Sequence, residues 1–588
     1  MPDDALPISG RTTLPPWHPA WARSLADLYY SGSTCVFVLH GNVHDLIRRE
    51  ADGKSEYGDL PEFLSTQLFG AWDVVLHYDL GKGLRALAGS DAARLKSMLQ
   101  ILGPLGEPQT WPRDPENVLL LLDKFIERNL LQEDPSRRKS IGVILDYAQY
   151  LAPAGDLGTL ARGPGTNLVR LLGWAQNPYI KRVNVAFCLI AGKLAEINDR
   201  LVQSPHIASI EIPMPELADR RNFGEWAAGS NDFSKISDIK PEELAQVSNG
   251  LSLVSLNVVL SQAKQSGVKL DARRFKALKK DMIERQCQGL LEFIEPDHTL
   301  DLVVGQQAAQ QRLREDADLI SRGKLEAAPM GYLLCGPVGT GKTFLAECYA
   351  GSIGIPCVKL RNFRSKYVGE TEGNLEQVLT VLRSLGPVVV IIDEADAALG
   401  NREAEGDSGT SSRVFSMIAS QMGDTRYRGR IVWMLLTSRP DLLPIDLKRQ
   451  GRAEVHIPLF YPQSDAEVRT MFQVMARKNK VSIKDEALPH LSSGMHLSGA
   501  DIESILLSAR RRALTSGREE LTKADLDEAA ADFIPSAQGL EKELQELAAV
   551  LECTQLNFLP ADWRSKVAKP DGRAVLQKRI VTIREMMA

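Results

Sequence analysis

The chain has 588 residues, enough for three or four domains of roughly 150 residues each. Its apolar fraction of 44% and charged fraction of 25% are ordinary for globular proteins and argue against long-range disorder. The formal charge of −5 argues against a protein whose main task is to coat nucleic acid, since such proteins carry a basic surplus.

Seven cysteines are spread along the chain without a C-x-x-C pair, which indicates isolated buried thiols in a reducing cytoplasm. The first ten residues have neither a basic start nor an apolar core, and no apolar run is long enough to span a membrane. We therefore expect a cytoplasmic protein without a signal peptide and without a membrane partner.

The N-terminal half alternates short apolar runs with helix-like stretches. After a proline-rich flexible segment at 1–20, the apolar runs lie at 35–41, 72–80, 140–148, 184–192 and 208–215. Continuous apolar runs separated by helical patterns predict a parallel sheet that is covered on both faces. We expect this α/β domain to occupy 21–214 and a helical lid or linker to occupy 215–298.

The C-terminal half repeats this pattern. A second α/β core is expected at 299–462, with strand candidates at 331–336, 357–360, 388–393, 431–438 and 454–459. A helical lid is expected at 463–534, and a short helical tail at 535–588. The two halves share an architecture without obvious sequence identity, which indicates an old duplication.

A glycine-rich segment at 336–343, GPVGTGKT, fits the pattern G-x-x-x-x-G-K-[ST] and lies between an apolar strand and a helix. Its glycines let backbone N–H groups turn inward around a polyphosphate, and the helix N-terminus adds partial positive charge there. We expect Lys342 to reach the β- and γ-phosphates of ATP, and the Thr343 hydroxyl to bind Mg²⁺. The predicted nucleotide-binding set is Gly336, Pro337, Val338, Gly339, Thr340, Gly341, Lys342, Thr343 and Phe344.

A second motif, PVVVIIDEAD at 387–396, predicts a buried strand that ends in two carboxylates. Open parallel sheets bind ligands at the carboxyl ends of their strands. We expect Asp393 to hold Mg²⁺, directly or through water, and Glu394 to take a proton from the attacking water. Together with the apolar pattern that both halves share, the motifs predict an α/β fold. It would have two parallel-sheet modules of the P-loop (RecA-like) type, each followed by a small helical lid, and a short helical C-terminal tail.

Further stretches resemble AAA proteins that pull on protein chains. RSKYVGETEGNL at 364–375 resembles their first pore loop, and GDSGTSSRVFSMIASQM at 406–422 resembles the second pore loop and its helix. The resemblance implies a protein substrate that is gripped by the first loop. The residues at that position are Lys366, Tyr367, Val368 and Gly369.

TSRPDLLPIDLKRQGRAEVHI at 437–457 resembles the segment that runs from the sensing strand to the arginine fingers. Arg449 and Arg452 match the two family arginines that reach a neighbouring subunit's nucleotide, where each would offset charge on the γ-phosphoryl oxygens. The resemblance thus implies a homo-oligomeric ring, usually of six subunits. Ser438 stands where the family usually has asparagine, so we expect slow or differently gated hydrolysis.

Two stretches resemble the family's adenine contacts. LSGADIESIL at 497–506 resembles the start of the lid helix, which implies that Gly499 and Ala500 lie beside the adenine. LDLVVGQ at 300–306 has Val304 where the family commonly has glycine. An adenine contact at that residue would use the backbone N–H and C=O and needs no particular side chain.

The N-terminal half resembles a degenerate copy of the same module. The run at 35–41 continues into NVHDL without a G-K-[ST] sequence, and Tyr147 stands in the place of a catalytic glutamate. We interpret this half as a non-hydrolysing domain for partner binding or ring assembly. The whole arrangement is similar to tandem-domain AAA proteins of bacteria, cyanobacteria and plastids, which carry one inactive and one active module.

Three functions stay open at this point. The preferred one is an ATP-hydrolysing motor that remodels, threads or disassembles a protein partner. The second is a nucleotide-switched assembly scaffold, in which slow turnover times the release of a complex. The third is a loader of nucleic-acid machinery, which the net negative charge disfavours. The sequence patterns specify neither the client protein nor its pathway.

Overall fold

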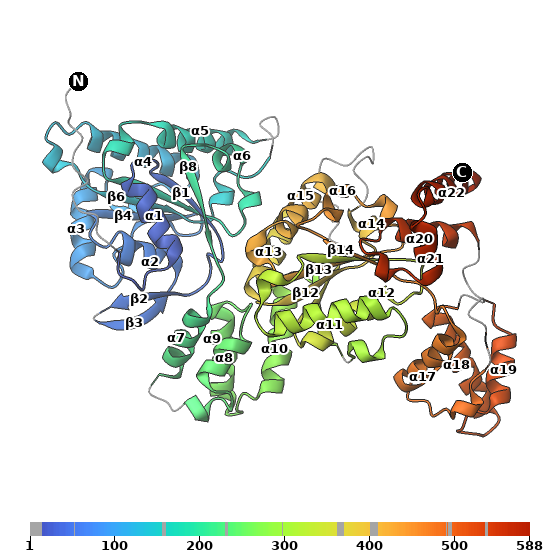
Figure 1. Cartoon of the computed structure of the whole chain (residues 1–588). Helices are drawn as coiled ribbons and strands as arrows, with labels where there is room; N and C mark the ends of the chain where they lie inside the picture. Colours follow the sequence, from blue (N-terminus) through green and yellow to red (C-terminus); the bar gives the residue numbers. More distant parts are fainter. Residues whose placement is uncertain are drawn as a thin grey trace. The chain divides into compact units, whose positions relative to one another are not determined.

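The computed structural model describes residues 14–51, 53–155, 160–229, 233–296, 298–361, 370–399, 410–489, 491, 497–534 and 539–587. The chain divides into two compact units (Figure 1). The first contains the residues up to Gln286 and helix α13 (Glu370–Ser384), and the second contains the other residues from Cys287 onward. We describe each unit by itself.

The first unit is built on a sheet that has six strands among the described residues. Their spatial order is β5 (Gly83–Ala86), β4 (Val74–Asp79), β6 (Ile141–Leu145), β7 (Val185–Ile190), β1 (Val36–Gly41) and β8 (Ile207–Ile212). Strand β5 is antiparallel to β4, and the other neighbours are parallel. Alternate residues of β1 enter different cores, with Val36 and Val38 on one face and Phe37 and Leu39 on the other. Both faces are buried, which confirms the predicted parallel sheet and explains its continuous apolar runs.

Helices cover both faces of this first sheet. The helices before the last strand are α1 (Ala20–Tyr30), α2 (Leu60–Phe63), α3 (Ala92–Leu102), α4 (Pro115–Leu130), α5 (Arg162–Gln176) and α6 (Asp199–Val202). Helices α4 and α5 contribute to the core that contains Val36, whereas α1 and α2 contribute to the core that contains Phe37. A helical part follows, made of α7 (Leu217–Ala228), α8 (Pro241–Val247), α9 (Leu253–Ser266) and α10 (Ala272–Gln286).

The sheet of the second unit, again within the described ranges, has six strands. Their order is β14 (Val455–Pro458), β10 (Gly331–Cys335), β13 (Ile431–Thr437), β12 (Val388–Ile392), β11 (Cys357–Leu360) and β9 (Leu291–Ile294). Strand β9 is antiparallel to β11, and the remaining pairs are parallel. Strand β10 lies between β14 and β13 just as β1 lies between β8 and β7. Among the described residues, the five parallel strands therefore follow the same order in both sheets, in agreement with the predicted shared architecture. The antiparallel edge strand comes after β4 in the first unit and before β10 in the second.

The helices of the second unit form three groups along the chain. Those within the α/β part are α11 (Gln307–Ser321), α12 (Lys342–Ile353), α14 (Ala395–Leu399), α15 (Thr410–Met422) and α16 (Ile445–Lys448). The lid consists of α17 (Asp465–Lys478), α18 (Gly499–Thr515) and α19 (Lys523–Ala531), and the tail of α20 (Leu540–Glu552), α21 (Ala561–Val567) and α22 (Gly572–Met587). The tail packs on the α/β part, because Phe558 belongs to the core beneath β10 and β13.

Short edge strands are the elements that sequence patterns did not predict. They are β5, β9 and the antiparallel hairpin of β2 (Ile47–Ala51) and β3 (Lys54–Gly58). Their residues are largely half-buried or exposed, so they lack the apolar runs that mark the central strands. An edge strand is buried on fewer sides, and its sequence resembles that of a loop.

All seven cysteines are free thiols and six of them are buried, which agrees with the prediction of isolated thiols. Of the helices in the described parts of the chain, none has the length and apolar composition that a membrane crossing requires.

One buried carboxylate connects the sheet of the first unit to its helical part. After β1 ends, Asp45 accepts hydrogen bonds from the backbone N–H groups of Leu253 and Val254, at 3.0 and 2.8 Å. These two residues begin α9, where the helix dipole favours a negative charge. The side-chain amide of Asn42 donates a further hydrogen bond to Asp45 at 2.7 Å. Burial raises the pKa of Asp45, although these hydrogen bonds oppose that shift.

We expect Asp45→Ala to destabilise the first unit by about 2–4 kcal/mol, because it leaves the α9 donors without an acceptor in a buried position. Asp91→Ala is the control, since Asp91 caps the exposed start of α3 through one hydrogen bond, and its loss costs about 1 kcal/mol. Urea unfolding followed by tryptophan fluorescence measures both. Equal effects of the two substitutions would contradict the role assigned to Asp45.

Candidate nucleotide-binding site

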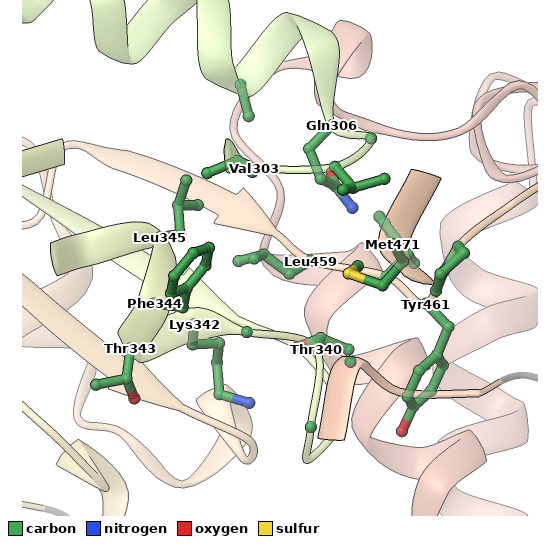
Figure 2. A pocket seen from close by; sticks show the side chains of 18 of the residues that line it. Val303, Gln306, Thr340, Lys342, Thr343, Phe344, Leu345, Leu459, Tyr461 and Met471 are labelled. Atoms are coloured by element: carbon green, nitrogen blue, oxygen red, sulfur yellow. The ribbon is translucent and has the colours of Figure 1, made fainter. Parts of the chain in front are cut away.

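A cavity of about 1030 Å³ lies at the C-terminal edge of the second sheet. Its walls come from the loop after β10, the ends of β12 and β13, the segment before α11, the lid and the tail. Figure 2 shows Lys342 and Thr343 at one side of this cavity and Met471 and Tyr461 at the other. Its volume is near the upper end of the range for small-molecule and cofactor sites.

The loop after β10 has a backbone that requires glycine. Gly336 has φ +146°, and a Cβ there would lie 2.3 Å from the carbonyl oxygen of Leu459. Gly339 has φ +84°, and a Cβ there would lie 2.7 Å from Cβ of Ser498 at the start of α18. Side chains at these positions would clash, so the glycines let the loop pass close to β14 and the lid. The loop ends at Gly341, the residue that precedes α12.

Lys342 folds back over this loop. Its ammonium donates hydrogen bonds to the carbonyls of Gly336 at 2.8 Å and Pro337 at 2.9 Å. Burial lowers the pKa of Lys342 to about 8. Lys342 is thus held in the loop as a cation at neutral pH. Phosphate oxygens are better acceptors for an ammonium group than carbonyls, so a bound phosphate would replace the two carbonyls.

Thr343 and Asp393 bring two oxygen ligands together. The Thr343 hydroxyl lies 3.5 Å from Oδ2 of Asp393, and both residues line the cavity. Hydroxyl, carboxylate and phosphate oxygens are the ligands that Mg²⁺ uses in nucleotide sites, so these residues fit the metal. Nζ of Lys359 on β11 lies 2.7 Å from the same carboxylate oxygen and offsets its charge. We found no cluster of three His, Cys, Asp or Glu suited to a metal in the described residues.

Glu394 adopts a left-handed backbone conformation, with φ +47°. Its side chain is exposed and lines the cavity, and its N–H donates to Oδ1 of Asp393 at 3.0 Å. Positive φ is uncommon outside glycine and is often found at functional sites. Tyr147 in the first unit has φ +53°, and its N–H donates to Oδ1 of Asp146 at 2.8 Å. The turn is therefore the same in both units, but only the second carries a carboxylate at this position.

The end of β13 carries the predicted sensing residue. Ser438 lines the cavity beside Glu394 and Lys342. The preceding residue, Thr437, donates from its hydroxyl to Asp396 at 2.6 Å and accepts the N–H of Arg439 at 2.9 Å. These bonds fix the backbone on both sides of Ser438.

The opposite end of the cavity is more apolar. Val304, Phe344, Gly499 and Ala500 all line it, together with Met471 and Met475 from the lid. Gln310 on α11 donates to the carbonyls of Val303 and Gly305, at 2.9 and 2.6 Å, and so fixes the backbone around Val304. A flat base would fit between these apolar side chains and the fixed backbone.

Four of the predicted residues that the structure describes, Gly336, Pro337, Arg449 and Arg452, are not among those that line this cavity. Arg449 is exposed, and Arg452 is half-buried with its guanidinium donating to the carbonyl of Asp446 at 2.7 Å. Burial, and secondarily the nearby Arg449, lowers the pKa of Arg452. The pore-loop residues Lys366, Tyr367, Val368 and Gly369 lie outside the described residues, so their predicted role stays a prediction.

The loop after β1 in the first unit carries a carboxylate and no lysine, and this carboxylate lines a smaller cavity of about 450 Å³. Asp45 follows β1 and accepts hydrogen bonds from the start of α9. In the second unit, the loop after β10 passes beside the start of α18 and leaves the cavity open. The strand end of the first unit thus has a buried, hydrogen-bonded carboxylate, and no G-K-[ST] sequence follows it. Both features support the interpretation of this half as non-hydrolysing.

Sequence reasoning missed several residues that shape the cavity. Lys359 and Gln310 belong to no recognised motif. Lys359 could have been marked as the one charged residue of an apolar strand, but Gln310 lies in the polar helix α11 and offered no signal. The tail also contributes, because Asn557, Phe558, Leu559, Pro560, Ala561 and Arg564 line the cavity. The sequence offered no signal for this contact, since it brings together segments about 200 residues apart.

Family comparisons agree with this layout. Residues 332–461 match the family described as "ATPase family associated with various cellular activities (AAA)". Residues 11–213 match "AAA+ chaperone, N-terminal Rossmann-like domain", and residues 218–288 match "AAA+ chaperone, second helical domain". The three matched segments correspond to the first sheet, its helical part and the second sheet.

Curated relatives share moderate identity with parts of the chain. A cell division cycle protein 48 homolog of Archaeoglobus fulgidus is 26% identical over 58% of this chain and 50% of its own length. The uncharacterized AAA domain-containing protein ycf46 of Trieres chinensis is 30% identical over 50% of this chain and 61% of its own length. The proteasome-activating nucleotidase of Methanothermobacter thermautotrophicus is 31% identical over 37% and 52%.

The chain thus spans about half the length of these relatives. The matched families, the repeated strand order and the glycine loop facing Asp393 all lead to one assignment. The chain belongs to the AAA+ ATPases, with an AAA+ chaperone N-terminal domain, a second helical domain and an AAA ATPase domain.

Proposed function

We propose that this protein hydrolyses ATP in its second module and uses the cycle to remodel a protein partner. The observation that carries the proposal is that Lys342, Thr343, Asp393, Glu394 and Ser438 all line one cavity. These residues come from three different strand ends, and each has the chemistry that one part of phosphoryl transfer requires. A protein that only bound nucleotide would not need a carboxylate in the position of Glu394.

The residues divide the chemistry among them. The ammonium of Lys342 would leave the Gly336 and Pro337 carbonyls and pair with the β- and γ-phosphate oxygens. Thr343 and Asp393 would hold Mg²⁺, which neutralises charge on the phosphate oxygens. Glu394 would orient a water molecule and accept its proton as the γ-phosphoryl group transfers. Ser438 would contact this water or the γ-phosphate.

The base would lie at the apolar end of the cavity. Val304 would contact adenine through its backbone, and Gly499 and Ala500 would approach from the start of α18. Because α18 belongs to the lid, closure of the lid on nucleotide would link the bound state to a movement of the helical part. That movement is the step at which hydrolysis would do mechanical work.

The position of the arginines supports a ring. Arg449 and Arg452 do not line their own cavity, and Arg449 is exposed. An exposed arginine beside the active face could reach the γ-phosphate of a neighbouring subunit, as in AAA rings. We therefore propose a homo-oligomer, with six subunits as the expected number, in which the first module assists assembly or holds the partner.

Glu394→Gln is expected to lower kcat for ATP hydrolysis by about 10²–10⁴ and to leave Kd for ATP within about threefold, because it removes only the proton acceptor. Glu503→Gln is the control. It removes a carboxylate from the same cavity wall, but one that is paired with Lys478. A steady-state phosphate-release assay and calorimetry give the two constants. If Glu394→Gln hydrolysed ATP at the wild-type rate, Glu394 would not be the proton acceptor.

The pKa of Lys342 leads to a pH dependence of ATP binding. Because the pKa of Lys342 is lowered to about 8, the free protein loses this cation as pH rises above 8. Kd for ATP should then be steady below that pH and rise by up to about tenfold per pH unit above it. Lys342→Arg should abolish the rise, since arginine stays charged. At pH 8.5, wild type should take up a proton when it binds ATP, and calorimetry in buffers of different ionisation enthalpy measures this uptake. ATP binding without proton uptake would contradict the role assigned to Lys342.

Tyr367→Ala distinguishes a threading motor from a nucleotide-switched scaffold. A motor that grips its substrate with Tyr367 should lose remodelling of a captured partner while its ATP turnover stays within about twofold. The partner can be captured first, because Glu394→Gln with ATP should hold it in the assembled state. Unchanged remodelling by Tyr367→Ala would favour the scaffold, in which Ser438 sets a slow timing step.

A further inference from the structure

The C-terminal tail contacts the phosphate loop directly. Oε1 of Gln545 on α20 accepts the backbone N–H of Val338 at 3.1 Å. Gln545 is buried, with 6% of its surface exposed. No predicted motif contains this residue, and it lies 207 positions from its partner.

The backbone of Val338 is held at both its N–H and its carbonyl. Its N–H is bound by Gln545, and its carbonyl accepts the Tyr461 hydroxyl at 2.9 Å. The tail also supports this second contact, because the ammonium of Lys542 lies 4.0 Å from the centre of the Tyr461 ring. The first half of the loop is therefore fixed by groups outside it, whereas Lys342 bonds only to carbonyls within it.

Helix α20 is suited to such a contact by its sequence. Gln545, Ala548, Ala549 and Glu552 recur at helical spacing, and the two alanines are almost fully buried. Their small side chains let the helix approach the end of β10, where the Cys335 thiol lies 3.9 Å from the carbonyl of Ala549. Two turns beyond Gln545, Glu552 pairs with Lys448 at 2.5 Å.

The other side of α20 secures it to the rest of the tail. Leu544, Leu547 and Val550 pack with residues of α22 and with Phe460, which follows β14. The connection from α20 to α21 then runs along the apolar end of the cavity, where Phe558 joins the core and Leu559 lines the wall. The tail thus contacts both the phosphate loop and the base end of one site.

We propose that Gln545 is a positioning residue for the nucleotide site, and that the docked tail preorganises the phosphate loop for ATP. This inference rests on the proposed ATPase function. Without an acceptor at 545, the peptide between Pro337 and Val338 would be held only through its carbonyl, by Lys342 and Thr340 of the loop itself. ATP binding would then have to order this peptide at a cost in affinity. The hydrolytic groups at the ends of β12 and β13 would stay in place.

The test compares Gln545→Leu with Gln555→Leu in the full chain. The first removes the acceptor while keeping the side-chain size, and the second makes the same change elsewhere in the tail, outside the cavity lining. We expect Gln545→Leu to weaken Kd for ATP about five- to tenfold, as loss of one hydrogen bond would. We expect kcat to stay within about twofold and Tm to match that of Gln555→Leu. A purely structural role would instead lower Tm and leave Kd unchanged.

A second pair of variants shows whether Gln545 acts through Val338. Val338→Pro removes the N–H that Gln545 accepts, so adding Gln545→Leu to it should cause no further loss of ATP affinity. An additional five- to tenfold loss in the Val338→Pro background would overturn the proposal. The comparison uses the Kd of Val338→Pro itself as its reference.

The effect of the tail on ATP binding can also be tested from the opposite direction, by measuring the effect of ATP on the tail. This measurement needs no proline variant. If the docked tail strengthens ATP binding, ATP must stabilise the docked tail by the same factor. Hydrogen exchange of the α20 amides in wild type should therefore slow about five- to tenfold on saturation with ATP, and this slowing should vanish in Gln545→Leu. Equal slowing in both proteins would overturn the proposal.

These experiments distinguish failure of the proposed ATPase function from failure of the role proposed for Gln545. If wild type binds no ATP, the proposed function itself is wrong. If wild type binds ATP and Lys342→Ala does not, but Gln545→Leu behaves like Gln555→Leu, the ATPase assignment stands and the role of the tail is wrong.

Discussion

The parallel pairing of β10, β13 and β12 is the constraint on which the rest of the second unit depends. Pairing in register places Cys335 opposite Thr437 and Ile392 opposite Leu435, so the three strands end at one edge. The glycine loop, Ser438 and the two carboxylates follow directly from these ends. The three strands are fully buried, so packing fixes their positions. The short loops that follow them are therefore also held in defined positions. The polar site is thus built on an apolar scaffold.

The first unit carries the same scaffold without the phosphate-loop motif. The order of its parallel strands and its left-handed turn at Tyr147 repeat those of the second unit. The loop after β1, however, carries Asp45, which satisfies the start of α9 from within the chain. No G-K-[ST] sequence follows β1, so this loop lacks the lysine and the hydroxyl that would bind phosphates and Mg²⁺. Retention of the fold without the site is consistent with a domain kept for its surfaces, because packing and catalysis depend on separate residues.

The sequence predicted the central strands and the main site residues because each is encoded locally. Apolar runs mark strands such as β12, and the spacing of glycines, Lys342 and Thr343 marks the phosphate loop. Edge strands such as β9 were missed because partial exposure removes the apolar signal. Lys359 and Gln545 were missed for another reason. Their roles depend on partners far along the chain, and only the three-dimensional packing shows that Asp393 and Val338 are those partners.

The central claim is that each chain has one working nucleotide site, formed by the loop at 336–343 and the carboxylates at 393–394. Titration calorimetry of Mg²⁺-ATP into the full-length protein tests this claim most directly, with the stoichiometry as its readout. The account predicts about one ATP per chain for wild type and no binding by Lys342→Ala. About two ATP per chain, or binding that persists in Lys342→Ala, would contradict it.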